Sequence, residues 1–259
     1  HMEGTLHVAV LFGGTSSEHD ISLRSANNVL HELSGLEYDL TLVGITRDGE
    51  WLNYTGVLDD VDEGDAWAAH DVCPVVVVPG GGLCRHEANG TLTRLDVDVA
   101  LPVLHGQGGE DGVTQALLES AGVPYVGCGV LSSAVCMDKA VANALMDAAG
   151  VPHCRWAAAS RADLALNGPV VLDAVEAKLG YPIFVKPANA GSSVGISKAA
   201  DRAMLEQAVE IALREDDKVV FEEFIDAQEV ECAAIGNPDD PATVSTTRPG
   251  EILAGAEFY

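Results

Sequence analysis

A lysine followed by a small-residue loop is the pattern with the clearest chemistry in this sequence. Lys186 lies at the end of the apolar run 181–187, and the loop GSSVG follows at 191–195. An ammonium group in that position can pair with the α- and β-phosphates of a nucleotide, while loop amides and hydroxyls close over the γ-phosphate. The glycines follow the lysine instead of preceding it, so this is not a P-loop. The pattern predicts a nucleotide clamp of another kind.

Other polar residues could complete such a site, although each also has a plainer interpretation. Lys139 lies in the helical segment MDKAVA, where a lysine is usually a solvated surface residue. Glu222, Glu223 and Glu229 flank Phe224-Ile225 and could accept hydrogen bonds from an adenine amino group or ribose hydroxyls. In so acidic a chain the same glutamates could equally be surface residues.

Two glycine-rich segments each follow an apolar run. Gly13-Gly14-Thr15-Ser16 resembles an anion-binding turn, but Glu18 at its edge suits a substrate ammonium better than a phosphate. Glu18 could equally be an exposed acid that the helix dipole stabilises. The segment 105–112, HGQGGEDG, places four glycines around His105, which indicates close approach of a ligand or of another loop. The alternative is a turn that Asp111 caps.

Charge and composition limit the class of protein. The chain has 259 residues, with 40 acidic against 14 basic side chains and a formal charge of −26. Such a field repels nucleic acid and anionic lipid, so we expect neither as a partner. The six cysteines form no C-x-x-C pair, which favours reduced thiols over a zinc site. No apolar run is long enough to span a bilayer and no leader opens the sequence, so we expect a cytoplasmic protein without membrane contact.

Apolar periodicity predicts an α/β fold. Strands are predicted at 7–12, 38–46, 75–79, 98–105, 181–187, 219–225 and 229–236. Helices are predicted from an Asp20 cap to Leu30, and at 113–122, 131–149 and 199–214. Asp48-Gly49 predicts a tight turn, 59–71 a loop or short surface helix, and 151–168 an irregular segment with a short helix. The alternation of strand, glycine loop and helix predicts an open parallel sheet, with ligands at the carboxyl ends of strands, where Glu18 and His105 both lie.

Five stretches, in order, resemble the D-alanine–D-alanine ligases of the ATP-grasp superfamily. They cover nearly the whole chain apart from the region around 48–97, and they are 11–26, 104–129, 133–143, 181–198 and 221–236. The resemblance implies an N-terminal Rossmann-like pre-ATP-grasp domain at 1–129, an ATP-grasp central lobe at 130–220, and the start of a C-terminal lobe at 221–259.

The resemblance also implies roles for individual residues. Glu18 would hold the ammonium of the first D-alanine, Ser192 would bond to that glutamate, and His105 would lie beside the amino acid. The two lysines, Lys139 and Lys186, would bind ATP phosphates, with Ser193 and Gly195 in the loop above them. Glu222 would contact adenine, Phe224 and Ile225 would form the hinge, and Glu229 would bind the ribose.

In that family ATP phosphorylates one D-alanine, a second D-alanine attacks the acyl phosphate, and Mg²⁺, or Mn²⁺ as an alternative, supports the transfer. The resemblance implies a homodimer that makes peptidoglycan precursors. The metal ligands, and a lysine, a tyrosine and an arginine of the family, are expected beyond Tyr259. The alternatives are a D-alanine–D-serine or D-alanine–D-lactate ligase, a non-catalytic nucleotide-binding module and, more remotely, a solute receptor.

Overall fold

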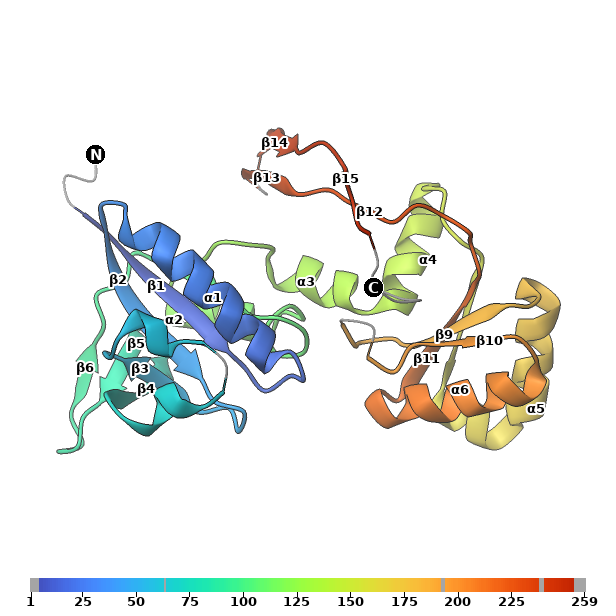
Figure 1. Cartoon of the computed structure of the whole chain (residues 1–259), viewed down its shortest axis with the longest axis horizontal. Coiled ribbons are helices and arrows are strands. Elements are labelled where there is room, and N and C mark those ends of the chain that lie inside the picture. Colours follow the sequence, from blue (N-terminus) through green and yellow to red (C-terminus); the bar gives the residue numbers. More distant parts are fainter. Residues whose placement is uncertain (1–4, 63, 192–193, 238–239, 254–259) are drawn as a thin grey trace. The chain divides into compact units, whose positions relative to one another are not determined.

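The computed structural model describes residues 5–62, 64–191, 194–237 and 240–253, and it divides into two compact units at Met137/Asp138 (Figure 1). Each unit has its own sheet and its own core. The three-part division with boundaries at 129/130 and 220/221 stays a prediction. No helix within the described residues combines the length and the apolar character that crossing a membrane requires.

The first unit is built on a seven-stranded mixed sheet in the order β6-β5-β4-β3-β2-β1-β7. Strand β1 (Leu6–Gly13) lies parallel between β2 (Tyr38–Ile45) and β7 (Val99–Pro102). The remaining strands run antiparallel to their neighbours: β3 (Trp51–Tyr54), β4 (Val72–Val78), β5 (Gly82–His86) and β6 (Leu92–Arg94). The predicted α/β class is confirmed, but the parallel arrangement holds only for β2, β1 and β7.

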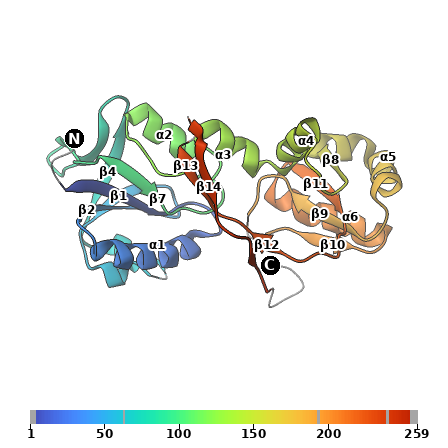
Figure 2. The same cartoon turned by 90° about the horizontal axis from the view of Figure 1, so that it is seen from above.

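Helices cover both faces of this sheet, as Figure 2 shows for α1 (His19–Ser34) and α2 (Val113–Ala121). Alternate residues of β1 enter opposite cores, because successive side chains of a strand point to opposite faces. Val10 and Phe12 pack with Leu23 of α1, whereas Ala9 and Leu11 pack with Leu118 of α2. A third helix, α3 (Val130–Met137), ends the unit.

Three sequence predictions for this unit need correction or refinement. Helix α1 begins at His19 with Glu18 in the capping position, so Asp20 is not the cap and instead pairs with Arg47. The segment 80–97 forms β5 and β6, which the apolar pattern missed because both strands are short. The segment 59–71 contains two short 3₁₀ helices, Leu58–Asp60 and Ala66–Ala69, and Trp67 of the second is fully buried. The turn at Asp48-Gly49 is confirmed by the positive φ of Gly49.

The second unit has a four-stranded antiparallel sheet in the order β10-β9-β11-β8. Its strands are β8 (Trp156–Ser160), β9 (Ile183–Pro187), β10 (Ser197–Ala199) and β11 (Lys218–Glu223). Helices α5 (Arg161–Leu179) and α6 (Arg202–Glu215) pack their apolar residues on this sheet, whereas α4 (Lys139–Ala149) contacts it mainly through Ala140. Two exposed strand pairs follow, β12 (Val230–Glu231) with β15 (Gly250–Glu251) and β13 (Ala234–Asn237) with β14 (Asp240–Thr246).

The predictions for 131–149, 151–168 and 229–236 need correction. The single helix predicted at 131–149 is divided at Asp138, whose backbone is extended and whose side chain accepts hydrogen bonds from the N–H groups of Ala140 and Val141. The segment 151–168 is irregular only as far as Arg155: it contains β8, which the prediction missed, and its helix is the start of α5. Ser160 and Asp163 form a capping box that begins α5. The single strand predicted at 229–236 is two short strands.

Candidate functional site

A glycine turn at the end of β1 positions the first group of candidate residues. Gly13 and Gly14 have φ values of 89° and 101°, a backbone region that glycine adopts readily. The N–H of Gly14 donates to the carbonyl of Ile45 at 2.9 Å. A Cβ atom on Gly13 would lie 2.2 Å from the same carbonyl oxygen, so the turn requires glycine there.

Glu18 follows this turn and is buried, with 7 % of its surface exposed. Its N–H donates to Ser16 Oγ at 3.2 Å, and its carbonyl accepts from the N–H of Ser22 at 3.0 Å. Its carboxylate lies against Gly106, because a Cβ atom there would be 2.3 Å from Glu18 Oε2. The structure therefore brings Glu18 and the loop that follows β7 together, at the carboxyl ends of two adjacent parallel strands.

The 105–112 loop is held by hydrogen bonds to its own backbone. Ser16 Oγ donates to the carbonyl of His105 at 2.7 Å, and His105 Nε2 lies 3.2 Å from Ser25 Oγ. Glu110 and Asp111 accept from the N–H groups of Gly106 and Gly108, at 2.7 Å and 2.8 Å. Asp111 also accepts from the N–H of Val113 at the start of α2, so the turn interpretation of this segment accounts for its two acids. The ring of His105 faces α1, because its Nε2 lies against Ser25.

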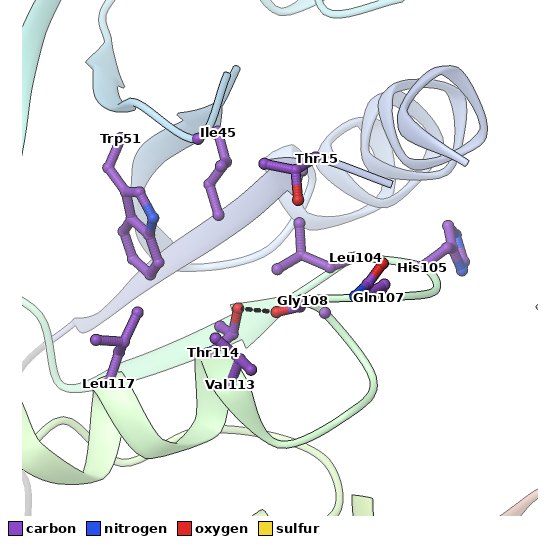
Figure 3. Close-up of a pocket in the computed structure, with 13 residues that line it drawn as sticks. Thr15, Ile45, Trp51, Leu104, His105, Gln107, Gly108, Val113, Thr114 and Leu117 are labelled. Atoms are coloured by element: carbon purple, nitrogen blue, oxygen red, sulfur yellow. Dashed lines mark hydrogen bonds between the residues drawn. The ribbon is translucent and has the colours of Figure 1, made fainter. Parts of the chain in front are cut away.

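A cavity of about 150 Å³ lies where the two glycine loops meet the end of β2 (Figure 3). Its lining is Gly14, Thr15, Ile45, Gly49, Trp51, Leu104, His105, Gln107, Gly108, Gly109, Val113, Thr114 and Leu117. Thr114 Oγ1 donates to the carbonyl of Gly108 across one wall. Glu18 is not a lining residue, so the buried carboxylate and this mostly apolar cavity are separate features.

In the second unit, the two predicted lysines lie close to one carboxylate. Lys186 Nζ, on β9, donates to Glu222 Oε2 of β11 at 2.5 Å. Asn143 Nδ2, on α4, donates to Glu222 Oε1 at 3.3 Å. Lys139 Nζ, one helical turn earlier on α4, donates to the carbonyl of Ala190 at 2.6 Å.

The electrostatics of this cluster follow from burial and from two like charges. Burial lowers the pKa of Lys139 below its ordinary value, and the positive charge of Lys186 lowers it further, whereas Glu222 acts in the opposite direction. The cluster is thus a pair of ammonium groups that a neighbouring anion stabilises. Phosphate oxygens could serve the same purpose.

Aromatic residues lie beside the lysines. The rings of Phe184 and Phe224 stack with centroids 6.0 Å apart, and Lys198 Nζ lies 4.5 Å from the Phe224 centroid. The N–H of Phe224 donates to the carbonyl of Pro182 at 3.3 Å. Phe224 and Ile225 are exposed, so both residues are accessible to a planar ring.

The structure does not bring all predicted residues into this cluster. The side chain of Glu229 is exposed, and only its carbonyl has a described bond, from the N–H of Ile252. Gly195 has a φ of 72°, and a Cβ atom there would lie 2.9 Å from Glu215 Cγ. Ser192 and Ser193 lie outside the described residues.

Sequence reasoning missed two participants. Asn143 lies four residues after Lys139 on one helix, which places both on the same face, so helical spacing could have found it. Asp138 pairs with Lys218 and caps α4, and it therefore fixes the start of the helix that carries Lys139. Nothing in the apolar pattern indicated that helix start.

These features define an α/β protein whose second unit is of the ATP-grasp type. The family model described as the D-ala D-ala ligase N-terminus matches residues 7–128, and the model for the D-ala D-ala ligase C-terminus matches residues 145–259. The D-alanine–D-alanine ligase of Caldicellulosiruptor bescii is 43 % identical over 255 residues, which is 98 % of this chain and 68 % of that protein. That of Acetivibrio thermocellus is 43 % identical over 266 residues, covering 97 % and 69 %.

Solved structures agree. The VanG D-Ala:D-Ser ligase from Enterococcus faecalis has a TM-score of 0.82 at 38 % identity, covering 95 % of this chain and 69 % of its own. The D-alanine–D-alanine ligase from Coxiella burnetii has a TM-score of 0.81 at 31 % identity, covering 96 % and 71 %. The chain belongs to the D-alanine–D-alanine ligase family, a family of ATP-dependent ligases, and the resemblance drawn from the sequence is confirmed.

Proposed function

We propose that this protein joins two D-alanine molecules at the expense of ATP, for the synthesis of peptidoglycan precursors. The observation that carries the proposal is the Lys139–Lys186 pair beside Glu222. In a chain with a formal charge of −26, a triphosphate is repelled unless a local cationic site exists, and the second unit supplies one.

In the nucleotide half, Lys186 and Lys139 bind the phosphates, and the loop with Ser193 and Gly195 closes over them. Glu222 accepts from the adenine amino group, the backbone at Phe224 and Ile225 forms the hinge, and Glu229 accepts from the ribose. Support comes from the Lys186–Glu222 contact and the exposed Phe224 edge.

In the amino-acid half, Glu18 pairs with the ammonium of the first D-alanine, and His105 and Ser192 complete the subsite. Support comes from the burial of Glu18 and from the close approach of its carboxylate to Gly106, where an added Cβ atom would collide with it. A carboxylate attracts a cationic ligand more strongly in a buried site than in water, because the effective dielectric constant is lower there.

The proposed reaction has two steps. A carboxylate oxygen of the first D-alanine attacks the γ-phosphorus, and the bond to the β-phosphate oxygen breaks, giving an acyl phosphate and ADP. The amine of the second D-alanine then attacks the acyl carbon, phosphate leaves, and the amine loses a proton. Lys139 and Lys186 neutralise charge on the phosphoryl oxygens, and Glu18 holds the first substrate in place.

Mg²⁺, or Mn²⁺ as an alternative, is the expected companion of the ATP phosphates in this proposal. Among the residues that the structure describes, no three His, Cys, Asp or Glu side chains converge on one point. Glu222, the carboxylate beside the lysines, is bonded to Lys186 and Asn143. The described residues therefore supply no set of ligands for the metal, and no step above depends on one.

Opposite effects of two substitutions on two ligands test the assignment. Lys186→Ala should weaken ATP binding far more than D-alanine binding, and Glu18→Gln should do the reverse. Lys178→Ala, which removes a charge over Trp156, serves as the control and should leave both affinities unchanged. Equal nucleotide affinity in Lys186→Ala and wild type would falsify the clamp, and nucleotide binding without phosphate release would favour the non-catalytic module.

The likeness to a D-Ala:D-Ser ligase supports one second candidate, in which the second substrate is D-serine. Rates with D-alanine, D-serine and D-lactate as second substrate separate the candidates, because only the preferred one should show saturation at low concentration. We also propose a homodimer, which light scattering of the eluted protein tests by its mass.

A further inference from the structure

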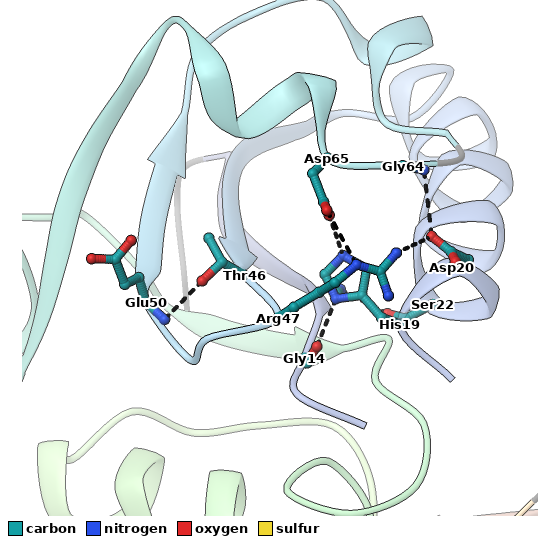
Figure 4. A network of polar contacts seen from close by, with 10 residues as sticks. Gly14, His19, Asp20, Ser22, Thr46, Arg47, Glu50, Gly64 and Asp65 are labelled. Atoms are coloured by element: carbon teal, nitrogen blue, oxygen red, sulfur yellow. Dashed lines mark hydrogen bonds and ion pairs between the residues drawn. The ribbon is translucent and has the colours of Figure 1, made fainter. Parts of the chain in front are cut away.

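A buried histidine at the start of α1 has no role in the reaction proposed above. His19 is fully buried and lies directly after Glu18 (Figure 4). Its Nδ1 is 2.6 Å from the carbonyl oxygen of Gly14, and its Nε2 is 3.2 Å from Asp65 Oδ1. Both ring nitrogens therefore face oxygens that, at neutral pH, can only accept a proton.

The oxygens on both sides of the ring limit the hydrogen bonds that His19 can make. A neutral imidazole carries one N–H, so its other nitrogen would direct a lone pair at a carbonyl or a carboxylate oxygen. The imidazolium form alone places an N–H toward both. The Nε2 contact lacks hydrogen-bond geometry, so the interaction with Asp65 is an ion pair by distance.

The charges around His19 balance when it is protonated. Asp65 also accepts from Arg47 Nε at 3.1 Å, and Arg47 Nη2 donates to Asp20 Oδ1 at 2.7 Å. The N–H of Gly64 approaches the same Asp20 oxygen at 3.4 Å. His19 and Arg47 thus face Asp65 and Asp20, two cations against two anions, which offsets the cost of burying the imidazolium.

His19 controls the turn that precedes the substrate acid. It holds the carbonyl of Gly14, while Ser22 Oγ, one turn further along α1, accepts from the N–H of Gly13 at 2.8 Å. Ser22 also donates to the carbonyl of Val103 in the segment after β7. The first turn of α1, which follows directly on Glu18, therefore fixes both the glycine turn and the segment after β7.

We propose that His19 is a positioning residue: as an imidazolium it locks the Gly13–Gly14 turn, and it thereby aims Glu18 at the ammonium of the first amino acid. The proposal rests on the proposed function, since it assumes that Glu18 binds that ammonium. His31 provides a matched comparison on the same helix, because its Nε2 lies 3.0 Å from Asp59 Oδ1 but its side chain is half exposed.

The first test concerns the charge of His19 and needs no substrate. Nitrogen chemical shifts of the ring, assigned with the His19→Gln variant, should show two protonated nitrogens in the 259-residue chain at pH 7. A neutral ring with one bare nitrogen would overturn the proposal.

The second test concerns the amino-acid site. His19→Gln keeps an amide N–H for Gly14 but removes the charge, and it should raise the half-saturating D-alanine concentration about tenfold, in line with the loss of a charged hydrogen bond. The ADP affinity of His19→Gln should equal that of wild type. His31→Gln should leave the D-alanine affinity unchanged.

A partner variant separates positioning from simple loss of folding. Asp65→Asn keeps the shape of the partner while removing its charge, and its effect on D-alanine affinity should not add to that of His19→Gln, because both break one contact. Equal losses of ADP and D-alanine affinity in His19→Gln, or unchanged D-alanine affinity, would overturn the His19 proposal alone. A wild-type protein that binds no D-alanine would instead overturn the proposed function.

Discussion

The two candidate sites are built on different physical principles. Around Glu18 the chain relies on backbone geometry: left-handed glycines and hydrogen bonds to main-chain groups set the positions of Ser16, Glu18 and His105. Around Lys186 it relies on charge, because two lysines are held near one carboxylate and one carbonyl.

This difference determines how each site responds to change. A glycine-dependent turn tolerates no added atom, so damage there should be seen first as lost stability. A charge cluster tolerates changes of shape but not of charge, so damage there should be seen first in nucleotide binding and its pH dependence.

The largest effect should come from adding one methyl group to the glycine turn. Gly13→Ala requires an alanine at φ 89° with its Cβ 2.2 Å from the carbonyl oxygen of Ile45, which is backbone and cannot move aside. The left-handed conformation and the clash together should lower the free energy of unfolding by about 3 kcal/mol or more. Urea denaturation measures this change.

Gly150→Ala is the matched control in the other unit. Gly150 ends α4 with a φ of 67°, and a Cβ atom there meets nothing within 4 Å. Only the conformational cost remains, about 1 kcal/mol. Equal losses at the two positions would show that the contact with Ile45 is not what makes Gly13 necessary.

The next largest effect should come from removing the shared carboxylate of the lysine cluster. Glu222→Gln takes away the charge that raises the pKa of Lys139, while burial and Lys186 continue to lower it. Lys139 should therefore lose its proton at a lower pH than in wild type. ADP affinity, measured calorimetrically from pH 7 to 10, should begin to fall at a lower pH in the variant than in wild type. Near pH 10 the variant should bind ADP about tenfold more weakly than wild type.

Glu223→Gln is the control, because it alters the adjacent carboxylate. Glu223 accepts from the N–H and Nε of Arg155, both at 2.7 Å, and has no described contact with either lysine. It should reduce stability without moving the pH profile of ADP binding. If Glu223→Gln moves the pH profile of ADP binding as far as Glu222→Gln does, then Glu222 is not the residue that raises the pKa of Lys139.

Much of the first unit could be predicted from the sequence, because the decisive signals there are local. The apolar run at 7–12 and the glycines after it define β1 and its turn, and Asp48-Gly49 defines the hairpin. The placement of Glu18 near the His105 loop follows from two parallel strands that end together. Strand direction was harder, since the antiparallel strands β3 to β6 depend on pairings that no single segment encodes.

The second unit shows where local signals fail. The apolar pattern runs through Met137 and Lys139 without a glycine or proline, yet the helix breaks there, because the Asp138 side chain bonds to the next turn and to Lys218. The Lys186–Glu222 contact joins residues 36 positions apart, so only the register of β9 and β11 reveals it.

The smallest predicted effect tests that helix break. Asp138→Ala removes the cap of α4 and the partner of Lys218, and it should lower the free energy of unfolding by about 1 kcal/mol. Asp138→Asn keeps an oxygen for the cap but not the charge, so it should cost less.

Burial alone would raise the pKa of Asp138, but the hydrogen bonds from Lys218 and from the α4 backbone outweigh it and lower the pKa below 3.8. The charged form is therefore the stabilising one, present above that value and lost as the pH falls through the lower, folded-state pKa. The stability difference between wild type and Asp138→Asn, from urea unfolding at several pH values, should be constant from pH 7 to 5 and shrink only below about pH 4. A difference that grows on acidification would mean that the cap, and with it the start of the helix carrying Lys139, does not depend on this ion pair.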